Sequence, residues 1–340
     1  MAGLGVSLPA RAAAEPPRVR LITTGGTISN RPGDRLSPDD LVALVPDLAE
    51  LVAAETEEFA NVPSSALTLD QWLRLGRRIN RVFDTDGDLA GIVVTSGTDT
   101  LEELAYFLHL TVRDARPVVI VGAMRRPETP GYDGVANLRQ AFRVAGDPAS
   151  RGRGVLVVLN DEIASARDVT KANAVHLQSF ETRGYGILGV TARDRIVYYR
   201  AIERRHTVGS EFDLGRVVRL PRVDIVLTYQ GASGDLIRAA VDRGARGLVV
   251  AGAGAGATSS GQRDAIAYAD EQGVPVVIAS RTGSGRIAPH PLDEDDPDVS
   301  AGRSALAGED LAPLKARILL MLGLTVTNDR AELARMFAEY

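Results

Sequence analysis

The chain contains, near its N-terminus, the stretch Val19-Arg20-Leu21-Ile22-Thr23-Thr24-Gly25-Gly26-Thr27. Its first part, Val19 to Thr23, has the length and the apolar, β-branched character of a buried strand, and two glycines follow soon after. Glycine lets the backbone turn sharply and brings N–H groups close to a ligand. The stretch therefore predicts a strand that places Thr27 at the carboxyl edge of a sheet, where open parallel sheets bind their ligands.

Short apolar runs alternate with segments of helical periodicity, which is typical of parallel sheets covered by helices on both faces. We predict strands at Val19 to Thr23, Gly91 to Thr95, Val118 to Val121, Val155 to Leu159, Asp224 to Leu227, Gly247 to Ala251 and Val274 to Ala279. An apolar stripe at helical spacing predicts a helix through Leu101, Leu104, Ala105 and Leu108. Asp99 and Glu102 have the spacing of a capping box at the start of this helix.

The length of 340 residues suits two domains, because domains commonly hold about 100 to 200 residues. The alternation lapses between His206 and Pro221. We expect an α/β protein with a larger N-terminal domain at 18–206 that carries the functional crevice, a linker at 207–220 and a smaller C-terminal α/β domain at 221–340. Each domain is expected to be a mainly parallel sheet flanked by helices. Helical stretches at Glu309 to Leu322 and Asp329 to Tyr340 end the chain.

The composition, 45% hydrophobic and 24% charged, matches an ordinary globular protein. The net charge of -5, with both signs interspersed, predicts no nucleic-acid partner. No apolar run approaches the roughly 18 residues of a membrane-spanning helix, so we expect no membrane partner. The absence of cysteine excludes disulfides, thiol nucleophiles and cysteine-ligated metals.

The histidines and the acidic residues give no signal for a metal site. The four histidines lack metal-ligand spacing, and we expect each of them on the surface or in the core: His109, His176, His206 and His290. The acidic run Asp293 to Asp296 lies in a proline-flanked loop and is expected to be solvated. We therefore predict no bound metal.

Only two of the 39 basic residues are lysines, Lys171 and Lys315. Arginine stays charged, whereas a desolvated lysine can lose its proton and act as a base. Lys171 follows a predicted strand in a polar run, and this placement favours a chemical role over chance survival of a coding bias. Lys315 lies on the amphipathic stretch Leu311 to Leu322, and we attribute it to chance.

Polar residues follow four successive predicted strands, at what should be one edge of the sheet. They are Thr27, the pair Thr98-Asp99, the small turn Gly122-Ala123-Met124 and Lys171. Each alone is as well explained by a tight turn or a helix cap. Together they supply a hydroxyl nucleophile and a lysine base held by a carboxylate, so they predict one catalytic crevice.

Several motifs, in order and spacing, resemble the bacterial L-asparaginase (asparaginase/glutaminase) family, and the type II enzymes in particular. The resemblance runs from about residue 19 to Tyr340. It rests on Thr24-Gly25-Gly26-Thr27-Ile28, Thr95-Ser96-Gly97-Thr98-Asp99-Thr100-Leu101-Glu102-Glu103, Gly122-Ala123-Met124-Arg125, Gly154 to Asn160 and Arg167-Asp168-Val169-Thr170-Lys171.

The resemblance implies hydrolysis of L-asparagine to L-aspartate and ammonia with no metal or organic cofactor, and weaker action on L-glutamine. By this resemblance Thr27 is the primary nucleophile. Thr98, Asp99 and Lys171 form the second catalytic group, in which Lys171 moves protons. Asp99 also holds the α-amino group of the substrate, and the Ala123 carbonyl fixes the leaving amide.

The resemblance also predicts a pocket, a lid and an assembly. The substrate-binding residues that it implies are Gly26, Ser64, Ser65, Gly97, Thr98, Asp99 and Ala123. Ser65 replaces the glutamine that is common in the family. The short stretch Asn30 to Arg35 is the expected lid, although the family's lid tyrosine has no counterpart between Ser29 and Ser37. The family forms homotetramers built as dimers of dimers, and we expect the same here.

Two other functions share some of these features. The same family fold serves as the amidase subunit of a glutamyl-tRNA amidotransferase, and a protein that kept the crevice without turnover would be a non-catalytic amino-acid-binding protein. The first residues, Met1 to Glu15, are rich in alanine and read either as the remnant of an export signal or as a disordered tail. The first of these readings predicts a periplasmic or secreted protein.

Overall fold

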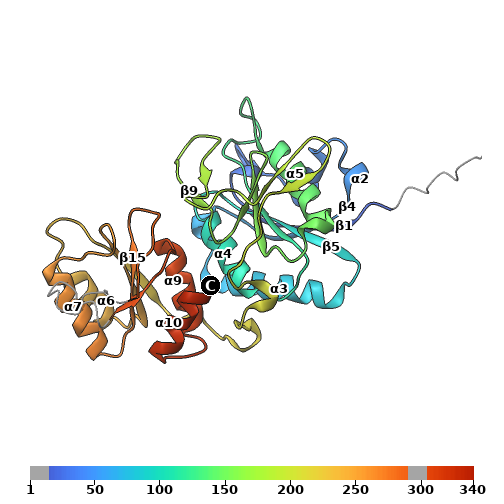
Figure 1. The fold of residues 1–340 in the computed structure, drawn as a ribbon. Coiled ribbons are helices and arrows are strands. Elements are labelled where there is room, and N and C mark those ends of the chain that lie inside the picture. The colour runs from blue at the N-terminus through green and yellow to red at the C-terminus, as the bar shows by residue number, and fades with distance from the viewer. Residues whose placement is uncertain (1–14, 290–304) are drawn as a thin grey trace, which may run out of the picture.

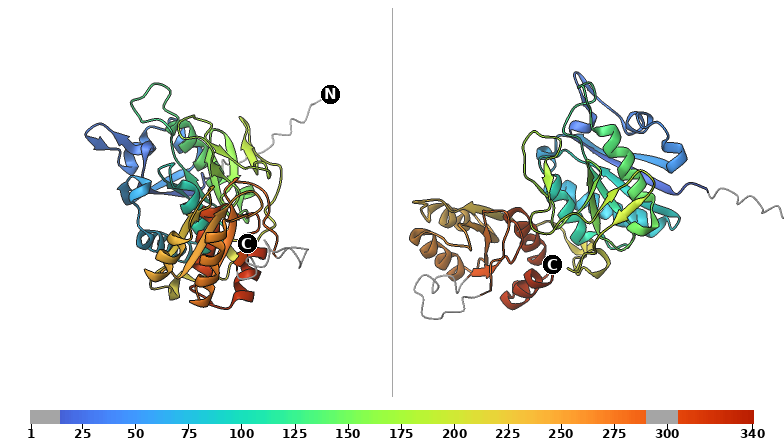
Figure 2. Two further views of the ribbon diagram at one scale, coloured as in Figure 1. Left: turned by 90° about the vertical axis from the view of Figure 1, so that its left-hand side faces the viewer. Right: turned by 45° about the horizontal axis from the view of Figure 1, so that its top comes forward.

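The computed structural model describes residues 15–289 and 305–340, which form two lobes that lie side by side (Figures 1 and 2). The N-terminal lobe is built on an eight-stranded sheet and the C-terminal lobe on a four-stranded sheet. The predicted α/β fold, with a larger N-terminal and a smaller C-terminal domain, is confirmed. His290, the run Asp293 to Asp296 and nearly all of Met1 to Glu15 lie outside the described residues.

The large sheet has the strand order β12-β11-β8-β7-β6-β5-β1-β4. Its strands are β1 (Arg18–Gly25), β4 (Ala53–Val62), β5 (Leu89–Thr95), β6 (Val118–Val121), β7 (Val155–Leu159), β8 (Glu162–Ser165), β11 (Gly189–Thr191) and β12 (Ile196–Tyr198). The pairs from β4 to β7 are parallel, and those from β7 to β12 are antiparallel. The opening stretch forms β1, which lies between β4 and β5.

Both faces of this sheet are covered, as the near-continuous apolar strands predict. Successive side chains of a strand point to opposite faces, so Ile92 and Val94 belong to one hydrophobic cluster while Val93 belongs to another. The first cluster lies under α3 (Leu69–Thr85) and α4 (Leu101–Thr111). The second lies under three other helices, α1 (Pro38–Ala43), α2 (Leu48–Leu51) and α5 (Gly134–Gly146).

The C-terminal sheet is parallel throughout, with the order β13-β14-β15-β16. Its strands are β13 (Val223–Leu227), β14 (Gly247–Gly252), β15 (Val276–Ser280) and β16 (Ala305–Ala307), and its helices are α6 (Asp235–Asp242), α7 (Ser260–Glu271), α9 (Pro313–Gly323) and α10 (Arg330–Glu339). Helix α9 packs against α4 of the other lobe (Figure 1). The first hydrophobic cluster therefore continues across the contact and includes Leu319 and Leu322.

The segment between β12 and β13 contains two short 3-10 turns, Thr207–Gly209 and Leu214–Arg216. Arg77 of α3 holds this segment by donating hydrogen bonds to the carbonyl oxygens of Leu214 (3.0 Å) and Val217. The linker predicted at 207–220 lies within this segment, and the numerical domain boundaries stay a prediction.

Candidate active site

The Thr27 turn begins where β1 ends, because two consecutive glycines adopt a left-handed backbone. Gly25 has φ 101° and Gly26 has φ 93°, and Thr27 opens a short 3-10 turn directly after them. A Cβ atom on Gly26 would lie 2.4 Å from the backbone nitrogen of Gly97. Only glycine allows this approach, which brings the Thr27 turn against the end of the next strand.

The ends of β4 and β5 close around this turn. Gly26 donates a backbone hydrogen bond to the Val62 carbonyl (3.1 Å), just before Ser64. A Cβ atom on Gly97 would lie 2.8 Å from the Ser64 hydroxyl oxygen, so the two turns are in close contact. Ser64 is buried and its neighbour Ser65 is exposed. Four of the residues that the sequence proposed for one pocket, Gly26, Thr27, Ser64 and Gly97, thus come from three adjacent turns.

The turn Gly122 to Met124 forms the next wall. A Cβ atom on Gly122 would lie 3.1 Å from the Thr98 methyl group, and Ala123 is fully buried. The Asp133 carboxylate holds this turn by accepting a backbone hydrogen bond from Met124 at 2.9 Å. It accepts another from Arg125 at the same distance. No motif in the sequence pointed to Asp133.

Lys171 is in direct contact with both residues of the predicted catalytic pair. Its Nζ atom donates hydrogen bonds to Thr98 Oγ1 (3.0 Å) and to Asp99 Oδ1 (2.6 Å). Thr98 is 5% exposed, whereas the Asp99 side chain is 76% exposed. A buried hydroxyl therefore shares an ammonium group with a carboxylate that remains accessible to a ligand from solvent.

The predicted capping box at the start of α4 does not form. Thr100 is the N-cap residue, and no side chain caps the first turn. Asp99 binds Lys171 instead, and Glu102 Oε1 accepts hydrogen bonds from Thr170 Oγ1 (3.1 Å) and from the Lys171 backbone nitrogen (3.0 Å). The spacing of the two acids predicted hydrogen bonds within the first turn of the helix. Both carboxylates instead accept hydrogen bonds from groups of the distant Lys171 segment.

The attribution of Lys315 to chance is wrong. Lys315 is 2% exposed, and its Nζ atom donates hydrogen bonds to the carbonyl oxygens of Arg167 (2.7 Å) and Val169. It therefore reaches from α9 to the segment that carries Lys171. The signal that the sequence analysis missed is a lysine within a helix whose neighbours are almost all apolar, because such a residue needs buried partners.

A tyrosine that was not predicted contacts the Thr27 turn. Tyr132 donates a hydrogen bond from its hydroxyl to the Ile28 carbonyl (2.6 Å), and burial raises the pKa of this hydroxyl above its usual range. The stretch expected to be the lid forms a short hairpin of β2 (Asn30–Arg31) and β3 (Asp34–Arg35). Arg35 of this hairpin donates to the Gly26 carbonyl at 3.5 Å.

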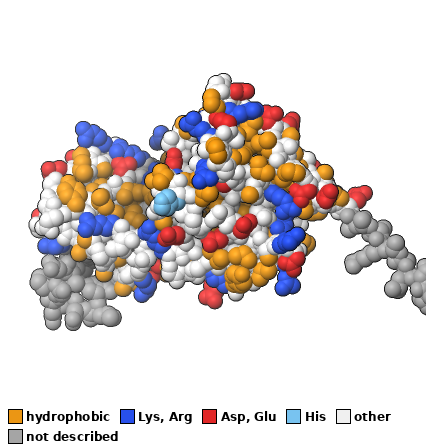
Figure 3. Space-filling view, turned by 90° about the horizontal axis from the view of Figure 1, so that it is seen from above, with side chains coloured by type: hydrophobic (Ala, Val, Ile, Leu, Met, Phe, Trp, Pro, Cys, Tyr) orange, Lys and Arg blue, Asp and Glu red, His pale blue; other side chains and the backbone are white. Residues whose placement is uncertain are grey.

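The described residues can also be examined for charge distribution, metal-ligand groups and membrane-spanning helices. On the face in Figure 3, basic and acidic side chains are interspersed over both lobes. Within residues 15–289 and 305–340, no three His, Cys, Asp or Glu side chains are grouped to hold a metal ion. No helix among these residues is long and apolar enough to cross a membrane.

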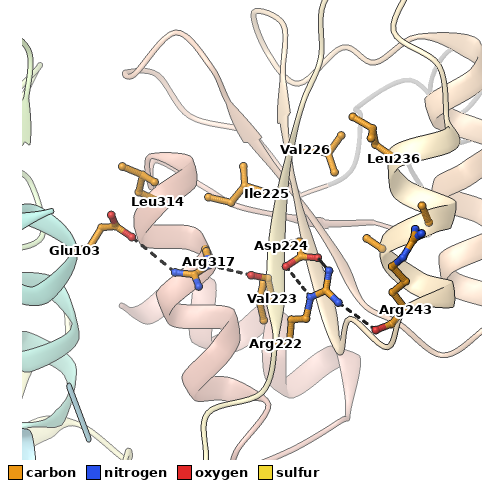
Figure 4. Close-up of a pocket in the computed structure, with 12 residues that line it drawn as sticks. Glu103, Arg222, Val223, Asp224, Ile225, Val226, Leu236, Arg243, Leu314 and Arg317 are labelled. Atoms are coloured by element: carbon orange, nitrogen blue, oxygen red, sulfur yellow. Dashed lines mark hydrogen bonds and ion pairs between the residues drawn. The ribbon is translucent and has the colours of Figure 1, made fainter. Parts of the chain in front are cut away.

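A cavity of about 570 Å³ lies elsewhere, between α4, α6, α9 and β13 (Figure 4). Arg317 of α9 crosses it by pairing with Glu103 of α4 (3.7 Å) and donating to the Val223 carbonyl (2.9 Å). None of the residues proposed for the crevice lines this cavity. The cavity therefore lies at the contact between the two lobes and is separate from the crevice at the strand ends.

Two family models match this chain, one in each lobe. The model described as "Asparaginase, N-terminal" matches residues 18–204, and "Glutaminase/Asparaginase C-terminal domain" matches residues 222–337. The chain is 41% identical to L-asparaginase 2 of Bacillus subtilis over 95% of this chain and 87% of that protein. It is 39% identical to L-asparaginase 2 of Escherichia coli over 95% of this chain and 93% of that protein.

The structure gives the same result. The crystal structure of a probable cytoplasmic L-asparaginase from Campylobacter jejuni matches with a TM-score of 0.88 at 36% identity, over 95% of this chain and all of that chain. The matches in sequence and in fold thus define an enzyme that hydrolyses linear amide C–N bonds. The chain belongs to the asparaginase family.

The names of the relatives differ in two respects. One relative, from Pseudomonas fluorescens, is named glutaminase-asparaginase and is 37% identical over 95% of this chain and 90% of that protein. A relative from Haemophilus influenzae, 36% identical over 99% of this chain and 97% of that protein, is named a probable periplasmic L-asparaginase, whereas the Campylobacter protein is named cytoplasmic. A periplasmic or secreted location therefore stays a prediction for this chain.

Proposed function

We propose that this chain hydrolyses the side-chain amide of L-asparagine to L-aspartate and ammonia, with weaker action on L-glutamine. The observation that carries the proposal is the contact of Lys171 Nζ with both Thr98 Oγ1 and Asp99 Oδ1 beside the Thr27 turn. A hydroxyl becomes a useful nucleophile or proton carrier only when a base is within hydrogen-bond reach. Lys171 Nζ lies within this reach of the Thr98 hydroxyl (3.0 Å), which supports the proposal.

In the proposed reaction the Thr27 hydroxyl oxygen attacks the amide carbon and loses its proton. The C–N bond breaks, the amide nitrogen gains a proton, and ammonia leaves while the acyl group stays on Thr27. Water then attacks this ester, which releases the carboxylate and restores the Thr27 hydroxyl. Thr98 and Lys171 carry the proton between the hydroxyl and the leaving nitrogen, since they share a 3.0 Å hydrogen bond.

The same residues account for substrate recognition. The exposed carboxylate of Asp99 can accept the α-ammonium group of an amino acid in a charge-assisted hydrogen bond. Backbone N–H groups near Thr98 are proposed to stabilise the negative oxygen that develops during attack. The Ala123 carbonyl is proposed to accept a hydrogen bond from the leaving amide, and Ser64 and Ser65 to hold the α-carboxylate. We propose that the active form is a homotetramer.

An ammonia-release assay tests this function with L-asparagine, L-glutamine and D-asparagine as substrates. We expect release from L-asparagine that falls by at least about a hundredfold in both Thr27→Ala and Lys171→Arg, because each removes a group used in the reaction. Thr85→Ala, an exposed threonine at the end of α3, serves as the matched control and should keep full activity. Near-normal release by a folded Thr27→Ala variant would contradict the mechanism, and stabilisation by asparagine without any ammonia would contradict the activity.

A further inference from the structure

A buried acid and a buried base lie on the two helices that meet at the contact between the lobes. Glu102 of α4 is 4% exposed and Lys315 of α9 is 2% exposed. Burial lowers the pKa of Lys315 to about 8, and the charges of Glu102 and Asp168 oppose this shift. Burying a charge is costly unless partners compensate it, so both side chains require a structural reason.

Both side chains hold the same five-residue segment, Arg167 to Lys171. Glu102 of α4 accepts hydrogen bonds from the Thr170 hydroxyl (3.1 Å) and from the Lys171 backbone nitrogen (3.0 Å). Lys315 of α9 donates to the carbonyl oxygens of Arg167 (2.7 Å) and Val169. The main chain that carries Lys171 is thus held by two helices from different lobes.

The surrounding contacts strengthen this arrangement. Arg167 makes two hydrogen bonds to the Asp310 carboxylate (2.8 and 2.7 Å) and one to the Tyr340 carbonyl (2.9 Å). Glu103, one position after Glu102, and Arg317, two positions after Lys315, form a second acid–base pair in the same contact (Figure 4). Arg317 contacts Glu103 and the Val223 carbonyl rather than the segment that carries Lys171, and it therefore provides a matched comparison.

We propose that Glu102 and Lys315 are positioning residues for Lys171, through which the C-terminal lobe sets the place of the proton-carrying amine against Thr98 and Asp99. The inference rests on the proposed function. A compact ammonium group can donate to two carbonyl oxygens from one point, which the wider planar guanidinium of arginine does not match. This accounts for a second lysine in a chain whose other basic residues are arginine.

The main test replaces Lys315 by methionine, which keeps the unbranched apolar stem of the side chain and removes its donors. We expect kcat for asparagine to fall about ten- to a hundredfold while KM changes by less than about twofold, since a displacement of about 1 Å at a reacting group can cost a factor of 100. Arg317→Met is the control: it should lower the melting temperature and leave kcat unchanged. An unchanged kcat in a folded Lys315→Met variant would overturn the proposal.

A rescue experiment separates positioning from a general loss of packing. The chain has no cysteine, so Lys315→Cys places one unique thiol at this site. Aminoethylation of that thiol in denaturant, followed by refolding, restores a side chain of lysine length with an amine at its end. We expect kcat to recover, with wild-type protein taken through the same steps as the reference. A refolded product that stays as slow as Lys315→Cys would contradict the proposal.

Three further variants separate the positioning role from a loss of folding and from the proposed function. Glu102→Gln keeps the side-chain volume and an acceptor oxygen, so it provides a milder test if the Lys315 variants do not fold. The double variant Glu102→Gln with Lys315→Met should lose less activity than the product of the two single effects, because both act on one segment.

Lys171→Met tests the proposed function itself. If it stays active, the relay is wrong, whereas an inactive Lys171→Met beside a fully active Lys315→Met would overturn only the positioning role.

Discussion

Both lysines of this chain are involved in one short segment, Arg167 to Lys171: Lys171 belongs to it and Lys315 binds it. They are 144 positions apart in the numbering (171 and 315). Lys171 extends from that segment to Thr98 and Asp99, and Lys315 reaches its carbonyl groups from α9. A flexible ammonium group with three donors serves both places. At the scale of single residues, the rare residue type therefore marks one functional region and not two unrelated positions.

The buried histidine of α4 affects the stability of the fold and not the proposed reaction. His109 is fully buried, and its Nδ1 atom accepts a hydrogen bond from the Val155 backbone nitrogen (3.1 Å), so the ring is neutral with its proton on Nε2. Nε2 is buried without a hydrogen-bond partner among the described residues. Burial, the neighbouring His206 and nearby cations hold the pKa of His109 well below 6.5.

We predict that this histidine makes the folded state sensitive to mild acid. Below about pH 6.5 the unfolded state binds a proton that folded His109 does not accept, so the free energy of unfolding falls as the pH falls. The expected contribution is up to about 1.4 kcal/mol per pH unit. Urea unfolding between pH 5 and 8 measures it, and His109→Gln should show a shallower dependence on pH.

The exposed His176 provides the control for that experiment. His176→Gln should have the same pH dependence of unfolding as the wild-type protein. An equal slope in His109→Gln and the wild-type protein would show that His109 is not the group responsible.

At the scale of elements, the catalytic crevice depends on turns that follow parallel strands. The turns after β1, β4, β5 and β6 approach so closely that Cβ atoms on Gly26, Gly97 or Gly122 would lie within 3.0 Å of neighbouring atoms. The strands are held in register by their backbone hydrogen bonds, so their turns form a rigid frame for Thr27 and Thr98. Glycine is required where these turns meet, because any side chain would separate them.

A single methyl group at one of these contacts tests that frame. In Gly97→Ala the new Cβ would lie 2.8 Å from the Ser64 hydroxyl oxygen, so we expect Ser64 to move and kcat/KM for asparagine to fall at least about tenfold. Gly87→Ala adds the same atom where nothing lies within 4 Å and should keep full activity. Equal activity of the two variants would mean that the close approach of the turns is not needed for catalysis.

At the scale of the whole molecule, the two lobes are joined by an apolar core and a buried charge network. Burial opposes ionisation of Asp310, but hydrogen bonds from Arg167 and Tyr185 hold its pKa below the usual range. Asp310 thereby links the C-terminal lobe to two residues of the N-terminal lobe. Such a contact favours a fixed arrangement of the lobes, which the positioning of Lys171 requires.

The described surface also carries large exposed hydrophobic side chains on both lobes, among them Tyr199, Val218, Leu227, Tyr229 and Leu236. Apolar side chains favour association where they lie together in one patch. We predict a homotetramer, with a mass in solution four times the chain mass of 36.1 kDa. Light scattering coupled to gel filtration over a dilution series measures this mass. A species of one chain mass at every concentration would contradict the prediction.

The sequence by itself determined seven of the strands, the order of the turns and most of the candidate site. It did not predict β4, β8, β11, β12 or β16. Apolar runs of strand length alternate with helices, and parallel connections place every strand end at one edge, so Thr27, Thr98, Asp99 and Lys171 could be predicted to meet. The contacts of Lys171 with Thr98 and Asp99 agree with that expectation. Periodicity and turn chemistry were sufficient because they act between near neighbours in the chain.

Only the tertiary structure decided which distant groups hold that site in place. Glu102 bonds to a residue 69 positions away, Tyr132 to one 104 positions away and Lys315 to one 146 positions away. The spacing of Asp99 and Glu102 pointed to a local cap, but contacts with Lys171 gave both carboxylates another partner. The packing of α4 against α9 brings Glu102 and Lys315 to the same segment, and no local pattern in the sequence encodes that contact.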